Sequence, residues 1–139
     1  MVVQDEKTEK ICCFYVSDFH LEMILVPYIN NKIEKNISIL TEKNLKETME
    51  ILISKMNINE NNKQKILNLG GEGKEKIEQN SNIIVIGSKK YIEEKNQEIM
   101  SLNAESILAC YSFEEEKNNI NDIVKNYKNS LNTLGKNNF

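Results

Sequence analysis

Apolar side chains along this chain gather in four short continuous runs, each followed by a segment with helical spacing. The runs cover residues 11–16, 37–40, 83–86 and 106–111. They are rich in β-branched and aromatic residues and do not alternate with polar positions, which is typical of strands buried on both faces of a sheet. The first run, Ile11-Cys12-Cys13-Phe14-Tyr15-Val16, predicts a central parallel strand.

Helix signals follow these runs. After the first run, Ser17 or Asp18 can accept backbone N–H groups as an N-cap, and Pro27 is expected to kink or divide the helix that begins there. After the third run, Ser88 can cap a helix that starts at Lys89.

Two further helices are predicted from apolar spacing. A short helix is expected over residues 63–69. After the fourth run, Ser112 opens a capping box for a last helix, which we expect to run to Gly135. Its apolar positions recur at helical spacing, at Ile120, Ile123, Val124, Tyr127, Leu131 and Leu134.

This order of elements predicts a single small α/β domain of three layers, with about four parallel strands in the order 2-1-3-4 and helices on both faces. In topology only, such a chain resembles flavodoxin-like and other small Rossmann-like domains. That resemblance implies a fold and no function, because these folds host many unrelated activities.

The domain organisation is predicted from the same pattern. Residues 1–10 are expected to be a disordered lead-in, residues 11–135 the α/β domain, and residues 136–139 a C-terminal tail. Residues 69–82 are expected to form a mobile loop, and shortening that loop should change stability little. Its Gly70-Gly71-Glu72-Gly73 segment follows a predicted helix and lacks the spacing of a phosphate-binding loop, so it indicates a flexible connector.

Length, charge and cysteine content argue against several classes of protein. A length of 139 residues suits one core, and no apolar run approaches the ~20 residues of a membrane span. No secretory signal is recognisable, so we expect a cytoplasmic protein. The net charge is −3 and all eighteen basic residues are lysine, which argues against nucleic-acid binding because arginine is preferred for reading phosphates and base edges. An odd cysteine count, with no C-x-x-C spacing, predicts buried and inert thiols.

The candidate site follows from the predicted strand order. In the order 2-1-3-4 the first and third strands are neighbours, and ligands of open α/β sheets bind where the carboxyl ends of such strands meet helix N-termini. Ser17, Asp18 and His20 would then face Gly87, Ser88 and Lys89 across a crevice. The free N–H groups of the second helix start and its lysines favour an anion. These six residues are the predicted ligand-binding set.

The function expected from these residues is non-enzymatic binding or regulation, with an anionic small molecule or a protein as partner. The protein would act alone or as a homo-oligomer. One alternative is a small enzyme acting on a phosphorylated or carboxylated substrate, in which His20 is the acid/base, with Asp18 beside it, and Lys89 anchors the anion. Another is a structural protein-interaction domain. No metal site is predicted, and no cofactor is identified by any motif.

Overall fold

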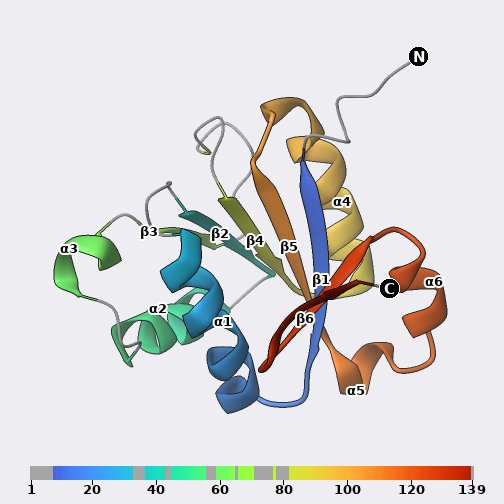
Figure 1. Cartoon of the computed structure of the whole chain (residues 1–139), viewed down its shortest axis with the longest axis horizontal. Coiled ribbons are helices and arrows are strands. Elements are labelled where there is room, and N and C mark those ends of the chain that lie inside the picture. Colours follow the sequence, from blue (N-terminus) through green and yellow to red (C-terminus); the bar gives the residue numbers. More distant parts are fainter. Residues whose placement is uncertain are drawn as a thin grey trace.

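The computed structural model describes residues 8–32, 37–42, 45–55, 59–64, 66–70, 77 and 82–138. Strands and helices alternate along the chain, which confirms the α/β class (Figure 1). In chain order the elements are β1 (Glu9–Tyr15), α1 (Asp18–Lys32), β2 (Ile37–Thr41), α2 (Leu45–Lys55), α3 (Glu60–Lys63), β3 (Ile66–Gly70), β4 (Asn82–Ile86), α4 (Lys89–Ile99), the 3₁₀ turn η3 (Met100–Leu102), β5 (Ser106–Ser112), α5 (Phe113–Glu116), α6 (Ile120–Val124), β6 (Asn129–Asn132) and β7 (Gly135–Asn138).

The strands form one sheet in the order β3-β2-β4-β5-β1-β6-β7. The six strands from β3 to β6 in this order are parallel, and β7 forms an antiparallel hairpin with β6. The four predicted strands are β1, β2, β4 and β5, so both the count of four and the order 2-1-3-4 are wrong. The observed order also differs from that of a flavodoxin-like sheet.

Two of the pairings join strands of equal length. The strands β1 and β5 each have seven residues and pair along their whole length, from Glu9↔Ser106 to Tyr15↔Ser112. The strands β2 and β4 each have five residues and also pair from end to end. Pairing along a whole strand satisfies the backbone N–H and C=O groups in the buried centre of the sheet. An apolar run marks a strand as buried but does not identify its neighbour.

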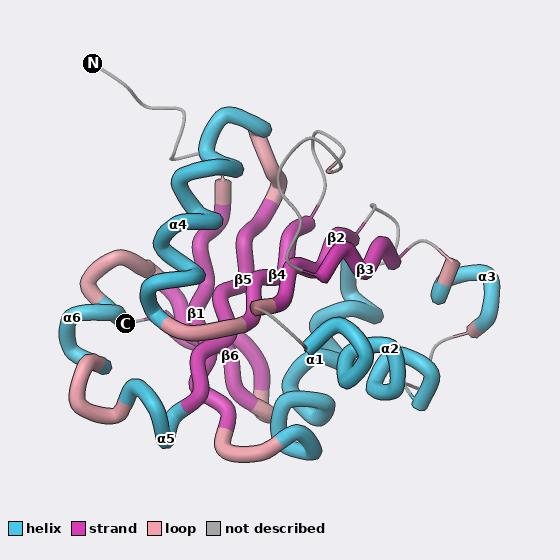
Figure 2. The backbone as a smooth tube through the Cα atoms, turned by 180° about the vertical axis from the view of Figure 1, so that it is seen from behind, coloured by secondary structure: helices cyan, strands magenta, loops and turns pink. Residues whose placement is uncertain are grey.

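Helices cover both faces of the sheet, as predicted. Side chains of α1 pack on one face, with Ile53 of α2 against the same cluster. Side chains of α4 and α6 pack on the other face, which Figure 2 views from the side of α4. Successive residues of β1 serve opposite faces, Cys13 in the first cluster and Cys12 in the second.

The predicted last helix is wrong. Ser112 does cap a helix start, since its Oγ accepts a hydrogen bond from Glu115 N at 3.4 Å, but α5 ends at Glu116. The chain then forms α6 and the β6–β7 hairpin. Tyr127 is buried on the α4 face and Leu131 on the α1 face, so one continuous helix could not bury both.

Three other expectations are corrected. Residues 66–70 form the strand β3 beside β2, rather than part of a helix, because a short apolar stretch can complete the backbone hydrogen bonds at a sheet edge. Residues 136–138 belong to β7 and are not a tail. The helix α1 continues through Pro27 as one element, so it is not divided into two segments there.

The loop predicted at residues 69–82 overlaps β3 and β4 at its two ends, and residues 71–76 and 78–81 lie outside the described part of the chain, as do residues 1–7 and 139. Within it, Ile77 is only 7% exposed and packs in the α4-side cluster. Residues 69–82 therefore contribute at least one side chain to the core.

The three cysteines, Cys12, Cys13 and Cys110, are free thiols and buried, as predicted. Burial raises the pKa of Cys12 to about 12. Among the described residues, no helix has the length and apolar character that crossing a membrane requires.

Candidate functional site

The first half of the predicted site lies where β1 leads into α1. Ser17 is the N-cap, because its Oγ accepts a hydrogen bond from His20 N at 3.1 Å. The imidazole of His20 accepts another at Nδ1 from Val16 N at 3.0 Å. Asp18 is exposed in the first helical turn. The imidazole thus closes a local turn.

The second half lies where β4 leads into α4. Ser88 is the N-cap of α4, and its Oγ accepts a hydrogen bond from Tyr91 N at 3.3 Å. Gly87 is tightly enclosed, since a Cβ atom there would lie 2.7 Å from the Tyr91 ring and 2.8 Å from Glu42 Cβ. Only glycine allows the chain to pass between these two side chains without a shift.

Two carboxylates from distant parts of the chain already bind the start of α4. Glu42, which follows β2, accepts hydrogen bonds from Ser88 N at 2.8 Å and Ser88 Oγ at 3.2 Å. Glu116, buried at the end of α5, accepts one from Lys89 N at 3.1 Å. The Lys89 ammonium pairs with Glu93 at 2.9 Å. The N–H groups expected to hold an external anion therefore donate to the protein itself.

The predicted crevice fails geometrically. Ser17 to His20 follow β1 and Gly87 to Lys89 follow β4, but β5 lies between these two strands. The two halves are therefore not at neighbouring strand ends. A binding role for either half stays a prediction.

A pocket lies at the other end of β1. It has a volume of about 240 Å³ and lies between the second half of α1, the start of β1 and the β6–β7 hairpin. Its apolar lining includes Ile11, Ile24 and Leu131, all buried in the α1-side core. Pro27, at the middle of α1, also lines it.

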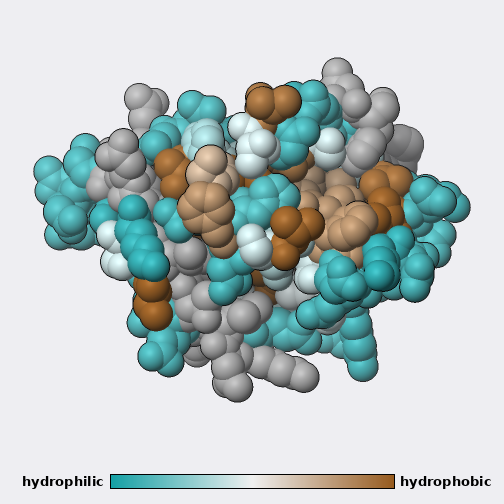
Figure 3. Space-filling model, turned by 90° about the horizontal axis from the view of Figure 1, so that it is seen from below, coloured by the Kyte–Doolittle hydropathy of each residue, from teal (hydrophilic) through white to brown (hydrophobic). Residues whose placement is uncertain are grey.

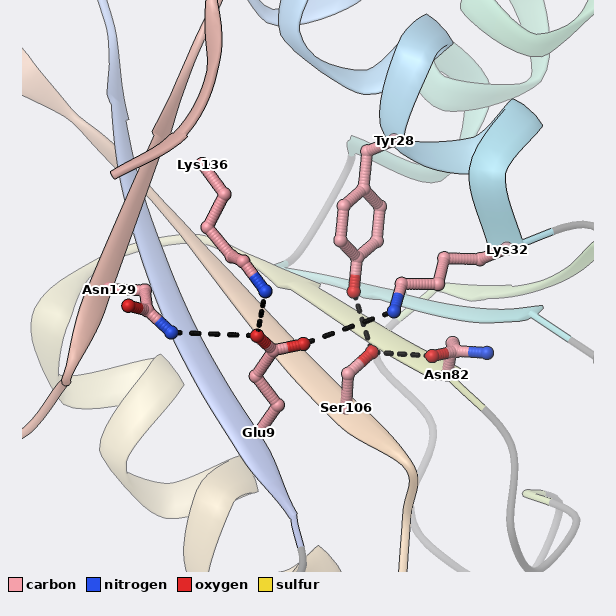
Figure 4. Close-up of polar contacts among 7 residues, drawn as sticks. All are labelled: Glu9, Tyr28, Lys32, Asn82, Ser106, Asn129 and Lys136. Carbon is pink, nitrogen blue, oxygen red and sulfur yellow. Dashed lines mark hydrogen bonds and ion pairs between the residues drawn. The ribbon is translucent and has the colours of Figure 1, made fainter. Parts of the chain in front are cut away.

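Polar side chains from three elements, two of them charged, converge on Glu9 in this pocket (Figure 4). Lys136 of β7 forms an ion pair with Glu9 Oε2, and Lys32 at the end of α1 lies 3.9 Å from Glu9 Oε1. Asn129 Nδ2 of β6 lies 3.5 Å from Glu9 Oε2. Two ammonium groups thus share one carboxylate, which leaves the group with a formal charge of +1.

A buried hydrogen-bond chain supports the wall of the pocket. The hydroxyl of Tyr28 lies 2.6 Å from Ser106 Oγ, and Ser106 Oγ donates to Asn82 Oδ1 (Figure 4). Because Ser106 has one hydroxyl proton, Tyr28 is the donor to it. Burial raises the pKa of Tyr28 well above its usual range, so the phenol keeps that proton. The Lys32 ammonium lies 5.9 Å from the centre of the Tyr28 ring, within reach of a cation–π contact.

Another hollow, of about 350 Å³, lies on the opposite face of the sheet. Its charged lining residues, Lys10 and Glu93, carry one charge of each sign. Beyond the rings of Tyr111 and Tyr127, Met100 is its one apolar lining side chain. It lacks the apolar floor of the pocket beside Glu9.

Comparison of the chain with protein-family models, curated proteins and solved structures gives no match.

Sequence reasoning missed the pocket because its charged residues fall outside the predicted domain or on a helix flank. The sequence pattern assigns Glu9 to the N-terminal lead-in and Lys136 to the tail. One signal pointed to the hairpin: Gly135, with φ +117°, follows a two-residue turn between β6 and β7. Glycine at a short connection between two strands is typical of such turns.

Proposed function

We propose that the protein is a non-enzymatic binding module for a small molecule that combines one anionic group with an apolar portion, bound in the pocket beside Glu9. The observation that carries this proposal is the convergence of Lys32 and Lys136 on a single carboxylate above an apolar floor. A small number of polar groups above an apolar lining is typical of small-molecule binding sites.

The size and charge of the pocket narrow the ligand. Its volume of about 240 Å³ is below the ~300–1,000 Å³ of pockets that hold drug-sized ligands. A carboxylate or phosphate would be attracted by the surplus positive charge, and each ammonium has three donors to share between Glu9 and the ligand. The ligand's apolar portion would pack on Ile11, Ile24 and Leu131.

An enzyme that uses His20 is less well supported. The Val16 amide occupies Nδ1 of the imidazole, so proton transfer would have to use Nε2. Lys89, the expected anion anchor, follows a strand that is not adjacent to β1 and pairs with Glu93. The two groups that the reaction needs do not come from neighbouring strands.

A thermal-shift screen tests the proposal, using a panel of small monocarboxylates and phosphate monoesters with and without apolar groups. A ligand at one hundred times its dissociation constant should stabilise the fold by about 2.7 kcal/mol. Inorganic phosphate, which lacks an apolar portion, should give a smaller shift than the best compound.

Variants locate the binding. The double change Lys32→Gln, Lys136→Gln should abolish the shift, and Asn31→Phe at the exposed rim should weaken it by filling the mouth. The matched control is Lys125→Gln, whose ammonium pairs with Asp122 on the open surface. A shift that survives the double change would place the ligand elsewhere, and a panel without any stabilising compound would contradict the proposal.

A further inference from the structure

Exposed apolar side chains are concentrated at the carboxyl end of β1 and β5. Val16, Phe19, Met23 and Phe113 are 67%, 69%, 47% and 40% exposed. The two strands pair as far as Tyr15↔Ser112, so Val16 and Phe113 are the residues that directly follow the ends of two neighbouring strands. Phe19 and Met23 lie one turn apart on α1 and share a helix face. We call these four residues the carboxyl-edge surface.

The carboxyl-edge surface belongs to the end of the molecule where α1 begins and α5 lies (Figure 1). Figure 3 looks onto this end and shows several apolar side chains exposed on a surface that also carries many hydrophilic ones. Large exposed apolar groups gathered in one region and rimmed by polar residues are typical of interaction sites.

The rim of this surface is acidic. Asp18 and Glu22 lie beside Phe19 and Met23 on α1, and Glu115 follows Phe113 on α5. No ion pair between described residues involves any of these three carboxylates. Glu114 is different, because it pairs with Lys117 at 3.2 Å.

Tyr15 supports this placement of the acids. Burial chiefly raises the pKa of Tyr15, and the charges of Glu115 and Asp18 raise it further. Two acids from different elements therefore act on the same phenol, at the last residue of β1.

We infer that the carboxyl-edge surface binds a cationic amphipathic segment of a partner protein, with lysine or arginine side chains on one side and apolar side chains on the other. The apolar residues would seat the partner's apolar side, and Asp18, Glu22 and Glu115 would attract its positive charges. Apolar anchors supply most of the affinity in such contacts, whereas rim charges mainly govern association rate and selectivity.

Charge argues against other occupants. An anionic membrane surface would be repelled by the three carboxylates. A second copy related by two-fold symmetry would present the same patch to itself and bring like charges together. The surface lies at the opposite end of β1 from the pocket, so this inference does not rest on the proposed function.

The test uses a fluorescent amphipathic peptide of lysine and leucine arranged with helical period, and a second peptide in which glutamate replaces every lysine. Fluorescence anisotropy with the full chain should show saturable binding of the lysine peptide that weakens as salt increases. The glutamate peptide should bind at least tenfold more weakly.

Variants of this surface separate apolar from charge effects. Phe19→Ser with Phe113→Ser should weaken binding at least tenfold. The control is Leu134→Ser, an apolar side chain 93% exposed on the β6–β7 turn. Asp18→Asn with Glu115→Gln should weaken binding several-fold and flatten its salt dependence, whereas Glu94→Gln on α4 should do neither.

Several outcomes would overturn the inference. Equal binding of the two peptides, or equal loss in the Leu134 control, would show that the contact is not specific to this surface. Sedimentation that reveals a dimer dissociated by the Phe19 and Phe113 changes would identify a second copy as the occupant.

Discussion

The start of α4 is held by two carboxylates from distant parts of the chain. Glu42, from the loop after β2, accepts two hydrogen bonds from Ser88, and Glu116 accepts one from Lys89 N. The perturbation is Glu42→Ala, which removes the acceptor and leaves the backbone of β2 unchanged. Glu94→Ala is the matched control, because Glu94 is an exposed acid within α4.

The expected cost follows from the contacts. A hydrogen bond to a charged group contributes ~1.5–3 kcal/mol, and a carboxylate near a helix N-terminus adds ~0.3–1 kcal/mol. Ser88 is partly exposed, so water can replace part of what Glu42 provides. We therefore expect Glu42→Ala to lower the free energy of unfolding by about 2 kcal/mol. The control should change it by less than ~0.5 kcal/mol.

Urea denaturation followed by circular dichroism measures this difference, with the midpoint shifted and the slope unchanged. The double variant Glu42→Ala, Glu116→Ala leaves the N–H groups of Ser88 and Lys89 without their carboxylates. Sulfate should then stabilise the double variant more than it stabilises the Glu94→Ala control at equal ionic strength. If Glu42→Ala costs no more than the control, or sulfate affects both proteins alike, the two carboxylates do not cap α4 as described.

Three further predictions concern the core. Burial raises the pKa of Tyr91 from 10.0 to about 12, and it raises the pKa values of the other tyrosines too, Tyr15, Tyr28, Tyr111 and Tyr127. The folded state holds these protons more tightly than the unfolded state, so stability should be intact below pH 10 and fall as pH rises towards 12. If phenolate absorbance appeared at a pH well below that at which the circular dichroism signal is lost, the tyrosines would not be buried in this way. Ile77→Ala should lower the free energy of unfolding, measured by urea denaturation, by ~2–4 kcal/mol, whereas Ile51→Ala at a half-exposed position should lower it little. Equal losses in the two variants would support the expectation that the loop is dispensable. The buried Cys12 thiol, with its pKa raised to about 12, should resist iodoacetamide in the native protein and react in urea, as mass spectrometry would show; rapid native labelling would refute its burial.

The centre of the sheet could be predicted from sequence and its edges could not. The four apolar runs correspond to β1, β2, β4 and β5, which lie side by side in the sheet. The strand β6 reads Asn-Ser-Leu-Asn, a segment with one apolar residue, and it becomes a strand by pairing with Ile11 and Cys12 of β1. Tertiary pairing of this kind overrides local preference.

In the predicted site, too, local contacts could be predicted from the sequence and long-range contacts could not. Ser17 and Ser88 were recognisable as caps because each bonds to a residue three positions later. Glu42 could not be recognised in this role, since it lies 46 residues before the Ser88 that it binds. The strand order decides such pairings, and no local pattern in this chain encodes that order.

The two proposed sites lie at opposite ends of β1, which makes their independence testable. Glu9, in the pocket, is the first residue of β1, and Val16, on the carboxyl-edge surface, directly follows the last. Seven strand residues span roughly 23 Å, well beyond the ~8 Å over which exposed charges interact at physiological salt. The strand pairs with β5 on one side and β6 on the other, so it is held within the sheet. A pocket ligand at saturation should therefore leave the affinity of the lysine peptide unchanged. A change of several-fold would mean that the sheet adopts two arrangements that both ligands distinguish, because coupling between sites requires such states.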